Sequence, residues 1–117
     1  MSEPSVDYVH FAERLESAWC IETSSLWSPI NPARGQCGVT SLVAHDLFKG
    51  YILKTLLPEG QHFYNFIGGR RYDFTSSQFD HPIDYQDLAS EREEAMSDTS
   101  PAQYQVLRTR LGLTVKD

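Results

Sequence analysis

The chain has 117 residues, of which 40% are hydrophobic and 12% aromatic, and sixteen acidic residues against ten basic ones give a net charge of −6. This size and composition predict a single globular domain over residues 1–117, with its core at about 6–112. The acidic balance argues against nucleic acid as a partner, because a nucleic-acid-binding module carries a basic stripe. No apolar run reaches the length of a membrane span, so we also expect no membrane partner.

Cysteine usage bears on the compartment. Cys20 and Cys37 are the two cysteines, which is fewer than a small secreted disulfide framework normally needs. The N-terminal residues lack a basic segment followed by an apolar run, as a signal peptide would have. We therefore expect free thiols and a cytoplasmic location.

Apolar residues at helical spacing predict a first helix that ends near Ala18, with Ser5 or Asp7 as its cap. The residues of this stripe are Tyr8, Phe11, Leu15 and Trp19. This helix has the pattern of a structural element that covers a core.

Prolines and glycines predict a loop over residues 22–35. Because loops that lead into a nucleophile often wall its site, Trp27 and Asn31 are candidate substrate contacts, although a plug on the core is the simpler explanation of Trp27. A second helix is predicted from about residue 36 to 48, apolar on more than one side and therefore central and buried. Asp46 falls within its apolar stripe, where a carboxylate needs a partner.

Three strands are then predicted at residues 51–56, 61–67 and 70–75. Gly68-Gly69 is a signal for a two-residue hairpin between the second and third of them. Further along, a short acidic helix is predicted to open at residues 84–87 and to run through Met96.

A last helix is predicted from the capping residues Ser100 and Pro101 to Gly112. The pattern as a whole predicts an α+β fold. N-terminal helices precede a central cysteine-bearing helix, which packs on a small antiparallel sheet, and a C-terminal helix completes the domain.

Cys37 is the residue that carries most chemical information, because it stands between two glycines at the start of the predicted central helix. A helix N-terminus carries a partial positive charge and free N–H groups. We therefore expect a lowered pKa for the Cys37 thiol, and N–H groups able to stabilise an oxyanion.

The predicted hairpin supplies a base and a residue to orient it. If Gly68 and Gly69 form the whole loop, His62 and Asp73 lie on one face of the sheet as diagonal neighbours. A carboxylate there can hold one imidazole nitrogen and leave the other for a thiol. Asn65 is the competing orienter, but it lies three positions from His62 and points to the opposite face unless a bulge intervenes. A three-residue loop would turn Asp73 away instead.

A metal site drawn from Cys37, His45, His62 and His81 is a further possibility. The spacing of these residues matches no zinc pattern, whose ligands usually come in close pairs. We accordingly expect neither a metal nor a cofactor.

Several segments together resemble the YunG-like group of small uncharacterised bacterial proteins. They are Gly-Gln-Cys-Gly-Val-Thr-Ser-Leu from residue 35, His-Phe-Tyr-Asn from residue 62 and Asp-Phe-Thr-Ser-Ser-Gln-Phe from residue 73. The resemblance covers roughly residues 24–111, which is nearly the whole chain. This group implies little about function.

At a greater distance, the order of cysteine, histidine and aspartate resembles the papain-like and transglutaminase-like superfamily. That resemblance implies thiol acyl-transfer chemistry, with Cys37 as nucleophile, His62 as base and Asp73 as orienter. The glutamine that helps to bind the oxyanion in papain lies several residues before its cysteine, whereas Gln36 is adjacent to Cys37. Gln36 and Asn65 are candidate oxyanion or substrate contacts. Because of the different spacing of Gln36, the backbone N–H of Cys37 is the better-placed oxyanion donor.

These observations predict a cysteine hydrolase or acyltransferase that acts on a peptide, another amide or a thioester. The alternative is a non-catalytic binding module or pseudoenzyme on the same fold. The short chain and the lack of an obvious specificity loop favour that alternative.

Overall fold

The structure is a computed structural model that describes residues 4–113, with side chains from Tyr8 onward. Within this range the chain has the predicted α+β architecture, and residues 1–3 and 114–117 of the expected domain lie outside it. The elements in order are α1 (Pro4–Ala18), α2 (Cys37–Phe48), β1 (Tyr51–Leu57), β2 (Gly60–Ile67), β3 (Arg70–Tyr72), a 3-10 turn (Ser76–Gln78), β4 (Leu88–Ser90), α3 (Arg92–Ser97) and α4 (Pro101–Arg110).

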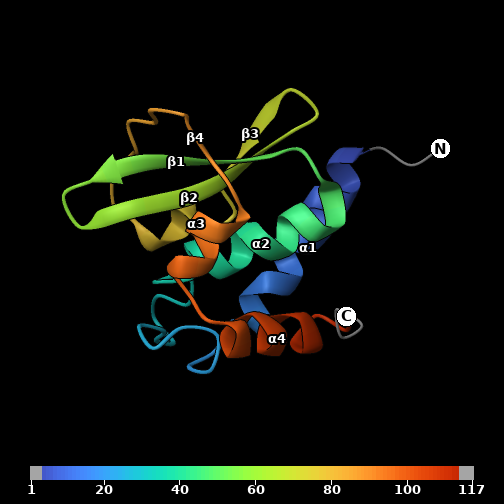
Figure 1. The fold of residues 1–117 in the computed structure, drawn as a ribbon. Coiled ribbons are helices and arrows are strands. Elements are labelled where there is room, and N and C mark those ends of the chain that lie inside the picture. Colours follow the sequence, from blue (N-terminus) through green and yellow to red (C-terminus); the bar gives the residue numbers. More distant parts are fainter. Residues whose placement is uncertain (1–3, 114–117) are drawn as a thin grey trace.

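Helix α2 is the centre of the molecule. The antiparallel sheet, with strand order β3-β2-β1-β4, covers one side of it, and α1 and α4 lie on the other side (Figure 1). Every residue of α2 from Cys37 to Ala44 is buried. A helix enclosed on both sides must be apolar on both, which is the pattern that the sequence predicts.

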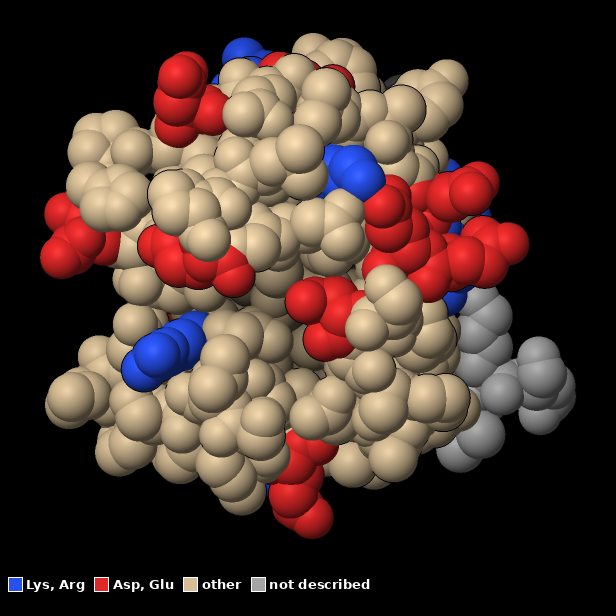
Figure 2. Space-filling view, turned by 60° about the vertical axis from the view of Figure 1, so that its left-hand side comes forward, with Lys and Arg blue, Asp and Glu red and all other residues tan. Residues whose placement is uncertain are grey.

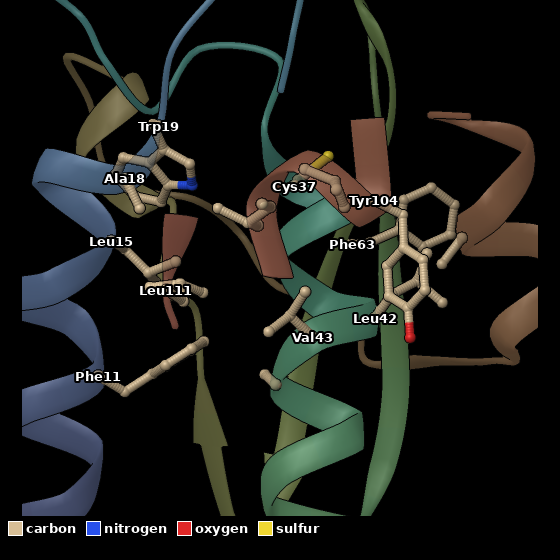
Figure 3. Packing of buried hydrophobic residues seen from close by; sticks show 14 of the residues in the cluster. Phe11, Leu15, Ala18, Trp19, Cys37, Leu42, Val43, Phe63, Tyr104 and Leu111 are labelled. Carbon is tan, nitrogen blue, oxygen red and sulfur yellow. The ribbon is translucent and has the colours of Figure 1, made fainter. Parts of the chain in front are cut away.

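The hydrophobic core lies on both faces of α2 (Figure 3). Phe11 and Leu15 of α1 pack on one face, and Phe63 of β2 packs on the other. Leu42 and Val43 of α2 lie between them with no exposed surface. Burial of each such side chain contributes about 1.5–3 kcal/mol to folding, so the core holds the N-terminus of α2 in a fixed place against β2.

Asp46 is the acidic residue of the mostly apolar helix α2. Its carboxylate forms salt bridges with Arg92 at 3.0 Å and Arg108 at 2.8 Å, and it accepts a hydrogen bond from Tyr104. The partners that the sequence requires for Asp46 therefore come from α3 and α4. Together they tie both helices to the C-terminal end of α2.

The hairpin has the predicted register. Gly68 and Gly69 form the two-residue loop with positive φ angles, and Ile67 and Phe66 pair with Arg70 and Arg71. The third strand is shorter than predicted, because it ends at Tyr72 instead of Thr75. The cause is local: the carboxylate of Asp73 accepts the backbone N–H of Thr75 at 3.2 Å and turns the chain.

The segment that follows differs from the prediction. Residues 84–87 are not helical, Leu88–Ser90 form strand β4 on the free edge of β1, and the helix covers only Arg92–Ser97. Asp87 has a positive φ of 54°, which is incompatible with a helix, and its carboxylate binds Arg71 of β3. A partner distant in sequence thus overrides the local helical pattern.

The helix termini follow the sequence in part. Helix α1 begins at Pro4, so Ser5 and Asp7 lie within its first turn, and the prediction of either as the preceding cap is wrong. Ser100 caps α4 as predicted, because its hydroxyl accepts the N–H of Gln103 at 3.2 Å. Among the described helices, none combines the length and apolarity needed to cross a membrane.

Candidate functional site

A pocket of about 530 Å³ opens where the N-terminus of α2 meets the beginning of β2. Its walls come from the loop before α2, the β1–β2 turn, residues 78–81 and the junction between α3 and α4. Cys37, His62 and Asp98 all line it. Figure 2, which brings the side of the β1–β2 turn forward, shows a hollow with acidic side chains around it.

Cys37 is the first residue of α2, and its thiol donates a hydrogen bond to Oδ2 of Asp98 at 3.5 Å. The backbone N–H of Gly38 donates to the same oxygen at 3.2 Å. Burial, and next the negative charge of Asp98, raises the pKa of Cys37 to about 12. The prediction of a lowered pKa is therefore wrong, because the thiol is buried and a carboxylate also occupies the positive end of the helix.

Gly38 explains how Asp98 comes so close. A Cβ atom at this position would lie 2.6 Å from Oδ2 of Asp98 and 2.8 Å from the carbonyl oxygen of Ala95. Both distances are shorter than van der Waals contact, so the glycine allows the end of α3 to rest on the start of α2. The contact between Cys37 and Asp98 depends on this absence of a side chain.

Asp98 itself is exposed to solvent as a residue, although its Oδ2 rests on the buried thiol. Desolvation by the surrounding protein raises the pKa of this carboxyl, and its hydrogen bonds from Cys37 and Gly38 oppose that effect. Sequence reasoning missed Asp98, which lies 61 residues after Cys37. The local sequence around Asp98 indicates only the approach to the cap of α4, Ser100, and does not indicate a contact with Cys37.

His62 and Asp73 lie together as the hairpin parity predicts. Nε2 of His62 is 2.6 Å from Oδ2 of Asp73, and the two side chains are 3% and 5% exposed. Oδ2 also accepts the hydroxyl of Tyr85 at 2.8 Å, and Oδ1 accepts the N–H of Thr75. Since a carboxylate can only accept a hydrogen bond, Nε2 carries the hydrogen in the neutral ring, and Nδ1 is the nitrogen that can accept one.

Cys37 and His62 approach the pocket from opposite faces of β2. The backbone N–H of Phe63 hydrogen-bonds Cys37, and the side chain of Phe63 packs with α2. Strand alternation sends His62 to the other face, where its ring meets Phe79 edge-on at 4.9 Å. Within the described residues no hydrogen bond joins Cys37 to His62, so the pocket is what they share.

Three other candidates lie away from the pocket lining. Gln36 is fully buried, and its Oε1 accepts the hydroxyl of Thr23 at 2.8 Å. Asn65 donates from Nδ2 to the carbonyl of Ser41 in α2 at 3.1 Å, and Trp27 packs half-buried against the core. The structure thus gives these side chains internal contacts, and the role of each as a substrate contact stays a prediction.

Asn31, in contrast, lines the pocket. Its Nδ2 donates to the carbonyl of Gln78 at 3.1 Å, while Gln78 donates from Nε2 to the hydroxyl of Thr75. This chain of bonds joins the loop before α2 to the turn after β3. Asn31 therefore holds two walls of the pocket together.

The residues considered as metal ligands are dispersed. His45 lies near the other end of α2, where its Nδ1 accepts a hydrogen bond from Arg92 at 2.9 Å. Only Cys37, His62 and His81 of the four line the pocket. In the described part of the chain, no group of three or more histidine, cysteine, aspartate or glutamate residues is arranged to hold a metal ion.

Comparison with known proteins identifies relatives. The model of the YunG protein family matches residues 7–116. A protein of Bacillus subtilis (strain 168) that bears the name uncharacterized protein YunG is 52% identical over 99 residues, which cover 85% of this chain and 86% of that protein. No solved structure gives a significant match.

Proposed function

The chain belongs to the YunG family, and we propose that it is a cysteine-dependent hydrolase or acyltransferase that acts on an amide or a thioester. One observation carries the proposal. Cys37 and His62 line the same pocket, and Asp73 holds Nε2 of His62 at 2.6 Å, which reserves Nδ1 for a proton from a thiol. The order of cysteine, histidine and aspartate along the chain, which resembles that of the papain-like and transglutaminase-like superfamily, is in keeping with this proposal.

In the proposed first step, the thiol of Cys37 gives its proton to Nδ1 of His62 through water in the pocket that both residues line. The sulfur attacks the carbonyl carbon, a C–S bond forms, and the carbonyl electron pair moves onto oxygen. The N–H of Cys37, at the N-terminus of α2, is the oxyanion donor. When the oxyanion collapses, the amine or thiol leaves with the proton from His62.

The second step returns the protein to its starting state. Water, or another nucleophile in the case of transfer, loses a proton to His62 as it attacks the acyl thioester. The C–S bond breaks, and the sulfur of Cys37 regains its proton. Because this thiol must be reduced, and because both Cys20 and Cys37 are free, the proposal includes a cytoplasmic location.

A small activated ester tests the proposal. We expect p-nitrophenyl acetate to acetylate Cys37, with the site located by peptide mass spectrometry and the rate followed by release of p-nitrophenolate. His62→Ala should slow acetylation about 100-fold or more, as the loss of a general base does. His10→Ala removes an exposed histidine and is the matched control, with an expected rate equal to that of the wild type.

The second candidate function is a non-catalytic binding module. The observation that favours it is the thiol of Cys37, which is bonded to Asp98 and has a pKa of about 12. If acetylation of Cys37 is equally slow in the wild type and in His62→Ala, and matches the rate of an unstructured thiol, the binding module is the correct reading.

A further inference from the structure

Asp98 places a negative charge against the sulfur atom that has to become negative. Its Oδ2 accepts the thiol of Cys37 at 3.5 Å and the N–H of Gly38 at 3.2 Å. A helix N-terminus alone would favour a thiolate, but a carboxylate in contact with the sulfur disfavours it. Without a ligand, the pocket therefore disfavours the thiolate form of Cys37, which the proposed reaction by itself does not explain.

His62 is the histidine whose charge acts on Asp98, and it lowers the pKa of that carboxyl without a salt bridge to it. Among the described residues, no lysine, arginine or histidine forms a salt bridge with Asp98, and it remains exposed on its pocket side. Glu59 and Asp80 also line the pocket, whose only Lys or Arg lining residue is Arg34. An anionic ligand would meet repulsion here, whereas a cationic ligand would find an unpaired carboxylate beside the nucleophile.

We propose that Asp98 is a specificity-determining residue that binds an ammonium or guanidinium group of the substrate next to the scissile carbonyl, and that this binding releases Cys37 for attack. The inference rests on the proposed function, since it names the substrate class of the same site. A bound cation cancels the field of Asp98 at the sulfur. It also competes for Oδ2, which frees the N–H of Gly38 beside that of Cys37 for the oxyanion.

Cys37 would then react fastest while a cationic substrate is present. His62 and Asp73 lie on the opposite face of β2, held by their own bond, and among the described residues Asp98 is the only titratable side chain that hydrogen-bonds the sulfur of Cys37. The other titratable residues of the pocket lining are Arg34, Glu59, Asp80 and His81. Asp98 is thus the charged group in direct contact with the sulfur. It is also the charged group whose neutralisation would lower the pKa of Cys37 most. A neutral or anionic acyl compound would leave the charge of Asp98 in place, so it would react with Cys37 more slowly.

Electrophiles of different charge test this inference directly. We would measure alkylation of Cys37 by 2-bromoethylammonium, iodoacetamide and iodoacetate, each divided by its rate with free 2-mercaptoethanol to remove intrinsic reactivity. In each reaction the sulfur forms the new C–S bond, halide leaves, and the thiol proton goes to His62 or solvent. We expect the normalised rates to fall from cation to neutral compound to anion, with about a tenfold or larger span, because a nearby charge changes a pKa by 1–3 units.

Asp98→Asn separates this explanation from general surface charge. We expect the variant to lose the charge order and to react with iodoacetamide about tenfold faster than the wild type. Asp84→Asn removes an exposed acidic residue outside the pocket lining and should retain the wild-type order. A measurement without mutation protects the test from misfolding: methylammonium chloride should accelerate the wild-type iodoacetamide reaction in a saturable way, while sodium chloride at equal ionic strength should not.

Each outcome decides the inference. Normalised rates independent of charge, or an Asp98→Asn rate equal to or below that of the wild type in folded protein, would overturn the role of Asp98. No methylammonium effect on the wild type would overturn it as well. Failure of the proposed function is distinguishable, because it shows as an unchanged rate in His62→Ala for every electrophile.

Discussion

The carboxylates that contact His62 and Cys37 have opposite surroundings. Asp73 is buried and accepts hydrogen bonds from His62, Tyr85 and Thr75, so it is held in one position. Asp98 is exposed, and among the described residues its side chain accepts hydrogen bonds from the thiol of Cys37 and the N–H of Gly38. A carboxylate fixed in this way suits an orienting role, and one open to solvent suits contact with a ligand.

The role of Asp73 gives a prediction for a single residue. Asp73→Asn retains an acceptor for Nε2 of His62 but removes the charge, and hydrogen bonds to charged groups contribute about 1.5–3 kcal/mol. We expect acetylation of Cys37 to slow by about tenfold to a hundredfold, measured with p-nitrophenyl acetate. Asp84→Asn makes the same change at an exposed site and should leave the rate unchanged. Equal rates for both variants would exclude Asp73 as an orienter.

The residues of the site differ in how far sequence could reveal them. His62 and Asp73 could be paired because a Gly-Gly loop sets the register, and the register sets the face of each side chain. Asp98 could not be found in this way, because its contact with Cys37 arises from the packing of α3 on α2. Gln36 lies next to Cys37 in sequence, yet it points into the interior toward Thr23.

At the scale of elements, the local sequence pattern predicts the helices and turns that are formed by interactions between residues close in sequence. Helix α2, the hairpin and the cap of α4 follow from apolar spacing, glycines and Ser100. Strand β4 could not be predicted, because its residues become a strand only by pairing with the edge of β1. The early end of β3 likewise depends on where the side chain of Asp73 finds its partners.

The attachment of α3 and α4 to α2 gives a prediction for elements. Asp46→Ala removes the common partner of Arg92 and Arg108 and leaves Arg108, which is 8% exposed, without that carboxylate. We expect the free energy of unfolding to fall by about 3–5 kcal/mol, measured by urea denaturation. Asp84→Ala, at an exposed site, should cost less than about 0.5 kcal/mol. A similar small loss in Asp46→Ala would show that these salt bridges do not hold the helices.

Gly38 connects the same elements to the pocket. In Gly38→Ala the new methyl group would meet Asp98 and the carbonyl of Ala95, so α3 would have to shift away from α2. We expect a loss of about 1–3 kcal/mol in unfolding free energy, together with faster iodoacetamide alkylation of Cys37 as the carboxylate withdraws. Slower alkylation, with the fold intact by circular dichroism, would contradict the assignment of Asp98 as the group that restrains the thiol.

At the scale of the whole molecule, several acidic groups retain their protons longer in the folded state than in the unfolded chain. Burial raises the pKa of Cys37 to about 12, and it also raises the pKa values of Tyr64 and Tyr85. In the unfolded chain, cysteine ionises near pH ~8.5 and tyrosine near ~10. Above these values unfolding releases protons, so stability is complete below about pH 8.5 and is lost as pH rises.

We therefore expect the unfolding free energy to decline on the alkaline side, by about 1.4 kcal/mol per pH unit for each group fully ionised in the unfolded chain. Urea denaturation at a series of pH values measures this slope. Cys37→Ala should reduce it between about pH 8.5 and 10, while Cys20→Ala controls for the loss of a thiol outside the pocket. An identical slope in Cys37→Ala and the wild type would show that the folded state does not hold this proton.

The measurement that tests the central claim most directly is the dependence of Cys37 acylation on His62 once Asp98 is neutral. The rate of acetylation by p-nitrophenyl acetate would be compared between Asp98→Asn and the double variant Asp98→Asn/His62→Ala. If His62 is the base for Cys37, the rate of the double variant should be lower than that of Asp98→Asn by about 100-fold or more. Equal rates in two folded proteins would contradict the account, because Cys37 would then react without the residue that Asp73 holds in place.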